Sequence, residues 1–254
     1  MTVTKSSPAL EALQQWQQWR HDRATELNEP FGWLSLTDLV WLDDTKSSVA
    51  QLPGRWWATN DAILVEPTIG AAPQITAVAE GESLTGVTLE DGSRVEFLAR
   101  SGHRGLRIRS TVNRPLGQDG LVPAAPYDTA WVKPATVAWF DQPRPVIVGS
   151  AQPGLQHHTA VTGTVTFTHE DAQHQLFIIG TGAAATVTYA DASPRTAAWR
   201  LLSLQIDPVD PGTTLLDFNF SQNYPSAFSR YGTCPAPTAG NTLPFAVLAG
   251  ELLP

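Results

Sequence analysis

The sequence contains little cysteine, little lysine and no long apolar run. Cys234 is the only cysteine among 254 residues, which excludes an internal disulfide framework and a cysteine-rich zinc site. Lys5, Lys46 and Lys133 are the only lysines, so arginine supplies most of the positive charge. No segment reaches the ~18 apolar residues of a membrane-spanning helix, and residues 1–20 hold no apolar stretch typical of a secretory signal. We therefore expect a cytoplasmic protein with no membrane partner.

The charge balance excludes another class of partner. The net charge of −8 argues against nonspecific binding of nucleic acid. Arginine suits planar, bidentate recognition of carboxylate or phosphate, although its excess over lysine is equally explained as surface composition. The chain has no Gly-x-Ser-x-Gly elbow, no P-loop, no His-Glu-x-x-His and no dinucleotide-binding glycine pattern. We expect no cofactor, and these absences weigh against serine hydrolases, nucleotide hydrolases and zinc peptidases.

The chain is rich in proline, glycine and tryptophan, with 20, 19 and 9 residues. The abundant proline and glycine predict many turns and short secondary-structure elements. One helix is expected from 8 to 27, with Ser6 and Ser7 as hydroxyl caps before it and Asn28-Glu29-Pro30 ending it. Its Trp16 and Trp19 must pack on something, and the helix is either a lid over one end of a sheet or a surface for a partner.

The rest of the chain has the pattern of short strands. Apolar or alternating runs are expected as strands at 55–58, 62–65, 84–89, 94–98, 105–110, 159–168, 174–179, 186–189, 198–206, 213–219 and 243–248. Asp91-Gly92 predicts a hairpin with a type I′ turn between two of them. Two proline-rich stretches, 115–126 and 143–153, interrupt the pattern. The sequence therefore predicts a mainly β fold, with sandwich-like or barrel-like subdomains and one N-terminal helix.

The proline-rich stretch at 115–126 is the best candidate for a boundary within the chain. We expect an N-terminal helix over 1–30, an N-terminal β subdomain over 31–114 and a C-terminal β subdomain over 115–254. A single continuous domain is the alternative, because such a stretch also fits a loop within one fold.

Polar residues are unusually dense near the C-terminus. Asp217 and Asn219 share one face of the expected strand, and Asn223 with Tyr224 and Pro225 forms a turn beyond it. These side chains either line a ligand pocket or form a buried hydrogen-bond network that fixes the turn. The sequence leaves both interpretations open.

Other candidates come from arginine, histidine and cysteine. Arg107 and Arg109 lie on the same face of an alternating run, where they clamp an anion or pair with surface carboxylates. His157-His158, His169 and His174 are the only histidine cluster, but adjacent strand residues face opposite ways, and we expect no metal site. Cys234 has no histidine near it in sequence, which favours a buried, unreactive thiol over a nucleophile.

A run of motifs spans nearly the whole chain. The most specific are Asp217-Phe218-Asn219, Asn223-Tyr224-Pro225, Thr233-Cys234-Pro235 and Gly250-Glu251, supported by Trp16, Trp19, Gly32-Trp33-Leu34, 104–109, Tyr127 and Trp131. With these motifs the chain resembles the bacterial domain of unknown function family 1684. The resemblance implies no assigned activity.

The chain departs from that family's pattern in two places. Where relatives often carry a second cysteine, this sequence has Ser226, so no thiol pair with Cys234 is implied. A glycine-rich stretch of the family is replaced at 191–200, where Asp191 and Arg200 are kept. This departure weighs against a site built on that stretch, and of its residues only Arg200 is kept among the candidates.

We predict a protein that binds a small molecule, with an anion favoured by the arginines. The candidate ligand-binding residues are Asp217, Asn219, Asn223, Tyr224, Arg107 and Arg200. The sequence names no reaction, no ligand and no oligomeric state. The alternative is a non-catalytic protein-interaction module whose C-terminal motif is structural; it would present an apolar patch rather than a pocket.

Overall fold

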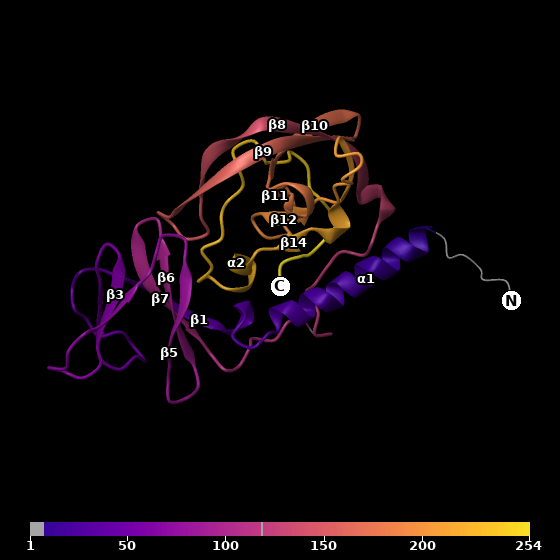
Figure 1. The fold of residues 1–254 in the computed structure, drawn as a ribbon. Helices are drawn as coiled ribbons and strands as arrows, with labels where there is room; N and C mark the ends of the chain where they lie inside the picture. The colour runs from indigo at the N-terminus through magenta and orange to yellow at the C-terminus, as the bar shows by residue number, and fades with distance from the viewer. Residues whose placement is uncertain (1–7, 118) are drawn as a thin grey trace.

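The computed structural model describes residues 8–117 and 119–254. Helix α1 spans Pro8–Leu27, the range that the sequence predicts; the expected cap residues Ser6 and Ser7 lie outside the described residues. Trp16, Ala24 and Leu27 are buried along one stripe of the helix, as the helical period requires. Figure 1 shows α1 (indigo) lying along the C-terminal part of the chain. Trp16 donates to the Asn219 carbonyl and Trp19 contacts Phe220, so both tryptophans pack on the C-terminal part of the protein.

The N-terminal part forms two small antiparallel sheets. The first has the order β1 (Leu36–Leu42), β7 (His103–Arg109), β6 (Arg94–Arg100) and β5 (Ser83–Thr88), and the second has the order β2 (Arg55–Ala58), β3 (Ala62–Glu66) and β4 (Gln74–Ala77). Their apolar faces enclose one core that includes Trp56, Ile63, Phe97 and Leu106. The short helix η1 (Trp33–Ser35) leads into β1.

The hairpin between β5 and β6 forms as predicted, but its turn type differs. The strands pair antiparallel, with Ser83 opposite Leu98. Gly92 has φ of 83° while Asp91 is not among the positive-φ residues, and a type I′ turn needs positive φ at both central residues. The Gly92 N–H donates to the Leu89 carbonyl. Glycine is therefore the last residue of a turn over 89–92.

The C-terminal part forms a seven-stranded antiparallel sheet. Its order is β13 (Thr213–Asp217), β8 (Val132–Gly149), β9 (Gln156–His169), β10 (Ala172–Ile179), β11 (Thr186–Tyr189), β12 (Arg200–Ser203) and β14 (Gln222–Asn223). Figure 1 shows β8, β9 and β10 arching over the chain's C-terminal segments. A core that includes Val165, Ile178, Tyr189 and Phe218 fills the concave side. The short helices are η2 (Thr129–Trp131), η3 (Gly182–Ala184), η4 (Phe218–Phe220) and α2 (Pro225–Phe228).

Two expected features are wrong in the C-terminal part. The proline-rich stretch 143–153 was expected to break the pattern, yet β8 runs through Pro143 and Pro145. The ladder with β9 is irregular between Trp139 and Arg144, and such a bulge accommodates proline in a strand. The strand expected at 243–248 is absent from the described elements; Leu243 is nevertheless buried in the core from a loop.

The predicted fold class is confirmed: the protein is mainly β, with one long N-terminal helix and sandwich-like sheets rather than a closed barrel. The predicted boundary at 114/115 stays a prediction. In the described part of the chain, no helix combines the length and apolar character needed to cross a bilayer.

Candidate functional site

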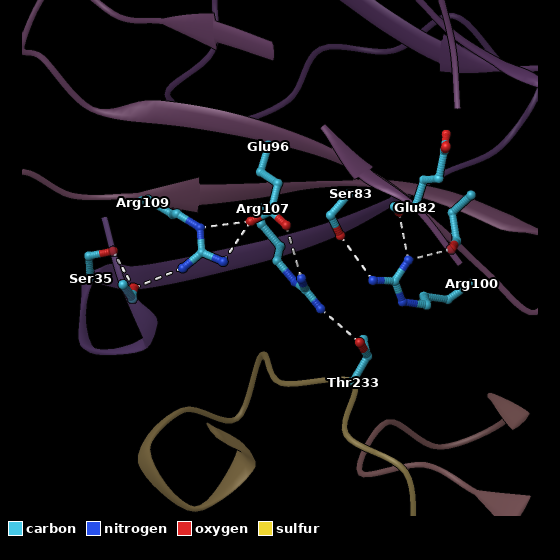
Figure 2. Close-up of polar contacts among 10 residues, drawn as sticks. Ser35, Glu82, Ser83, Glu96, Arg100, Arg107, Arg109 and Thr233 are labelled. Carbon is cyan, nitrogen blue, oxygen red and sulfur yellow. Dashed lines mark hydrogen bonds and ion pairs between the residues drawn. The ribbon is translucent and has the colours of Figure 1, made fainter. Parts of the chain in front are cut away.

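Arg107 projects from β7 toward the C-terminal part of the chain. It is 2% exposed, and its Nη2 donates to the Thr233 hydroxyl at 2.7 Å. Figure 2 shows Arg107 reaching from the N-terminal sheet to Thr233 on the C-terminal segment. The ring of Trp33 lies 5.3 Å from its guanidinium carbon. A buried guanidinium is thus held at the junction of two regions that are far apart in sequence.

A single carboxylate, Glu96, pairs with two arginines. Glu96 is opposite Arg107 in the ladder; it accepts from Arg107 Nη1 at 3.2 Å and from Arg109 Nε at 2.7 Å. Burial opposes ionisation of Glu96, but the charges of Arg109 and Arg107 outweigh it and hold its pKa below the ordinary value. The two arginines share a face, as the alternation predicts, and the group of three carries a surplus positive charge.

A cavity of about 650 Å³ lies beside this group, and we call it the inter-sheet cavity. Its N-terminal wall is formed by Trp33, Glu80, Gly81, Arg100 and Arg107, and its C-terminal wall by Gln156, His157, His158, Tyr224, Pro225, Thr233, Cys234 and Pro235. A cavity of this size suits a small-molecule ligand.

Arg100 is the second arginine of the cavity. It sits at the end of β6, where its Nη1 donates to the carbonyl oxygens of Glu82 at 2.6 Å and Ala99 at 2.7 Å, and its Nη2 donates to the Ser83 hydroxyl at 2.9 Å. Figure 2 shows these contacts. Among the described residues it forms no ion pair within 4 Å. The guanidinium is therefore fixed in position by neutral oxygens.

Glu80 supplies a carboxylate to the same cavity. Its oxygens accept the backbone N–H groups of Ser101 and Gly102. Ser101 also joins the two walls, because its hydroxyl donates to the Gln156 carbonyl and accepts the Gln156 N–H, both at 2.7 Å. Glu80 thus stabilises the tight turn after β6, and its charge offsets part of the positive charge of the cavity.

His157 faces the cavity from the start of β9. Burial lowers its pKa, and the Arg100 charge acts in the same direction, while the Thr233 backbone and Glu80 oppose them. The Nε2 atom is buried and bonds no described residue. The lowered pKa keeps the His157 ring mainly neutral at pH 7.

Tyr224 and Cys234 line the other side of the cavity. The Tyr224 hydroxyl lies 2.6 Å from that of Thr188, and burial raises the pKa of Tyr224. Cys234 is 8% exposed. Burial raises the pKa of its thiol, although hydrogen bonds with Ser226 and the charge of Arg107 oppose this. The thiol is protonated at neutral pH, as the unreactive interpretation expects.

Cys234 is expected to react slowly with a disulfide reagent in the folded protein at pH 7, because only the thiolate is a nucleophile. The same thiol should react rapidly and stoichiometrically in denaturant, which provides the control. Rapid labelling of the folded protein would restore the nucleophile interpretation.

Asp217 and Asn219 lie elsewhere, in a buried network. The chain turns into η4 after Asp217, so the two residues do not share a strand face as the sequence predicts. Asn219 is 0% exposed; its side-chain amide donates to the Asp128 carbonyl at 2.9 Å and to Asp217 at 2.7 Å, and accepts the Asp128 N–H at 3.0 Å. Trp16 of α1 donates to the Asn219 carbonyl.

The Asp217 carboxyl also accepts from the Tyr127 hydroxyl at 3.2 Å. Burial, followed by the Asp217 charge, raises the pKa of Tyr127 to about 12. Burial raises the pKa of Asp217 as well, against its hydrogen bonds from Asn219 and Tyr127. These hydrogen bonds join η4 to α1 and to the residues at the start of η2, so this part of the C-terminal motif fixes η4 against both.

Asn223 and Arg200 anchor the C-terminal segment. Arg200 is fully buried; it pairs with Asp191 at 2.8 Å and donates to the carbonyls of Val247, Ala249 and Glu251. The Asn223 side chain donates to the Leu252 carbonyl, and its N–H bonds the buried Glu251 carboxylate. Neither side chain lines the inter-sheet cavity.

The C-terminal sequence matches a family model. The family is described as "Protein of unknown function (DUF1684)", and the match covers residues 120–252, more than half of the chain. The chain belongs to the DUF1684 family. The matched region contains the C-terminal wall of the inter-sheet cavity but not Arg100 or Arg107. Comparison with curated proteins finds no match.

Five chains of solved structures match this DUF1684 protein, and one of them shows a weak similarity. It is the solution NMR structure of an uncharacterised protein from Haloarcula marismortui, 20% identical, with a TM-score of 0.44. The match covers 54% of this chain and 82% of that chain. Similarity at this level carries no functional argument.

The structure places two of the predicted site residues, Arg107 and Tyr224, in the lining of the inter-sheet cavity, and the other four do not line it. Sequence reasoning missed Arg100 and Trp33, because each joins the cavity only through the packing of separate sheets. One feature of the sequence could have indicated Arg100: it directly precedes the Ser101-Gly102 turn. Residues beside loops often take part in binding. Residues 8–117 and 119–254 contain no group of three or more histidine, cysteine, aspartate or glutamate side chains placed to hold a metal ion.

Proposed function

We propose that this DUF1684 protein binds a small anionic molecule in the inter-sheet cavity. The observation that carries the proposal is the placement of Arg100 and Arg107 on one wall, where neither charge is fully balanced. Arg107 shares its carboxylate partner with Arg109, and Arg100 bonds neutral oxygens. On a chain with a net charge of −8, this local surplus favours an anion at the cavity.

The positions of the two guanidinium groups support the proposal further. Each is already fixed by protein oxygens, so little side-chain entropy is lost when a carboxylate or phosphate binds. Arginine presents several N–H donors in one plane, which suits planar anions. Trp33 and Tyr224 add aromatic surface for an apolar part of the ligand.

The proposal assigns binding and no reaction. The Cys234 thiol, with its raised pKa, is poorly suited to attack a substrate. Three of the other motif residues, Asn219, Asn223 and Arg200, are at most 1% exposed. A binding role uses the groups that line the cavity and requires no activated nucleophile.

Titration calorimetry with citrate, benzoate and inorganic phosphate tests the proposal. At least one of these anions is expected to bind with a Kd of about 1 mM or lower. Arg100→Gln should weaken that binding at least about tenfold, as removal of a charged hydrogen bond does. Arg195→Gln is the matched control, because Arg195 is exposed and outside the cavity. The absence of binding by all three anions would contradict the proposal.

Binding of citrate is expected to raise the pKa of His157. The free protein holds the ring neutral, and a nearby anion favours the protonated form. Binding therefore takes up a proton, and affinity rises as the pH falls through the pKa of the His157 ring in the complex. NMR titration of the His157 ring with and without citrate measures the shift, with the ring of His21 on α1 as the control. An unchanged or lowered pKa would place the anion away from His157.

The alternative, a protein-interaction module, has its best support at the connection between β3 and β4. Ile69 in that connection and Ile75 on β4 are 78% and 68% exposed. The alternative predicts that Ile69→Ser with Ile75→Ser removes capture of a protein partner and leaves anion binding unchanged. The calorimetric experiment separates the two functions.

A further inference from the structure

A second hollow, distinct from the inter-sheet cavity, lies between α1 and the C-terminal sheet. Its volume is about 440 Å³, within the range of small-molecule sites. Gln15 and Trp19 come from α1, Gln222 comes from β14, and Phe220 comes from η4. The end strands of the seven-stranded sheet, β13 and β14, both contribute to it. We call it the helix–sheet hollow.

Most polar side chains around this hollow have no hydrogen-bond partner among the residues that the structure describes. The side-chain amides of Gln15, Gln205 and Gln222, the Ser203 hydroxyl and the Trp19 indole N–H bond no other described residue. An amide carries two donors and an acceptor with two lone pairs, and a hydroxyl both donates and accepts. The hollow thus offers a set of neutral groups that match a ligand with many hydroxyls.

The aromatic wall and the charge distribution narrow the ligand class. Trp19 and Phe220 meet edge to face, with centroids 5.3 Å apart, and both border the hollow. No lysine, arginine or histidine lines the hollow in the described part of the chain. Its only charged residue, Asp217, repels anions and already accepts hydrogen bonds from Asn219 and Tyr127, so it offers little to a cation.

We propose that the helix–sheet hollow binds a neutral polyhydroxylated ligand, a short oligosaccharide. The apolar face of one sugar ring contacts Trp19 and Phe220, as the C–H groups of a ring pack on aromatic surface. The ring hydroxyls exchange hydrogen bonds with the three glutamine amides and Ser203. This site is independent of anion binding in the inter-sheet cavity.

NMR titration with maltotriose, cellotriose and the N-acetylglucosamine trisaccharide tests the proposal, with trigalacturonate as the charged counterpart. At least one neutral trisaccharide is expected to shift the side-chain amide signals of Gln15, Gln205 and Gln222, at concentrations up to about 10 mM. The double variant Gln15→Ala, Gln205→Ala should weaken that binding at least about fivefold. The matched control Gln14→Ala, Gln17→Ala changes exposed residues of the same helix outside the hollow.

Three outcomes would overturn the proposal. The first is that no neutral trisaccharide binds. The second is that trigalacturonate binds more tightly than every neutral sugar. The third is that both double variants bind as the unchanged protein does. Both variants alter exposed glutamines on α1 or after β12, so unfolding is not expected to obscure the comparison, and thermal unfolding verifies this.

Discussion

Replacing Arg107 with methionine is expected to abolish citrate binding and to lower the free energy of unfolding by about 3 kcal/mol. The loss of binding follows because the variant removes the buried guanidinium from the cavity wall. The loss of stability follows because Glu96 keeps only Arg109, and Thr233 loses the donor that joins the two regions. Calorimetry and urea denaturation measure the two effects separately.

Arg109→Met provides the matched control for this variant. Arg109 pairs with the same carboxylate and contacts the same tryptophan, at 5.1 Å from its ring, but it does not line the cavity. This variant should lose comparable stability and still bind citrate. Equal citrate binding by both variants and the unchanged protein would show that the anion does not use Arg107.

The second large effect is expected at Asn219. Asn219→Ala should lower the free energy of unfolding by about 3 kcal/mol. The Asp128 N–H and carbonyl lose the hydrogen bonds that the buried Asn219 amide supplies, and Asp217 loses a hydrogen bond as well. Citrate binding to the remaining folded protein should be unchanged. Urea denaturation measures the stability, and Asn60→Ala is the control, because Asn60 is exposed.

This result decides between the two interpretations that the sequence leaves open. A large loss of stability with intact citrate binding means that Asp217 and Asn219 serve the fold. A stable variant that no longer binds citrate would instead return the ligand site to this motif. The two measurements are made on the same sample, so the outcome does not depend on comparing preparations.

Local patterns predict the helix and most strands of this protein. The helix-stopping sequence Asn28-Glu29-Pro30 places the end of α1 correctly at Leu27. It could be recognised because the stop depends only on neighbouring residues. β8 was missed because Pro143 and Pro145 indicate a break, and only the irregular ladder with β9 explains how the strand continues. The turn into η4 was missed because Phe218 and Phe220 alternate with polar residues as in a strand, although the Asp217 side chain caps the turn.

The candidate site was only partly predictable, for a different reason. Arg107 and Tyr224, two of the predicted site residues, line the same cavity. Their proximity depends on the contact of β7 with the segment around Thr233. That contact joins residues more than a hundred positions apart, and no local period encodes it. The burial of Arg200 against the C-terminal carbonyls is likewise set by tertiary packing.

The most direct test of anion binding in the inter-sheet cavity is the response of individual arginine side chains to citrate. NMR spectra of the guanidinium Nε–H groups report each arginine separately. Anion binding at this cavity predicts that the signals of Arg100 and Arg107 shift together and saturate at one Kd, while that of Arg195 stays in place. Shifts confined to other arginines, or none at saturating citrate, would contradict it.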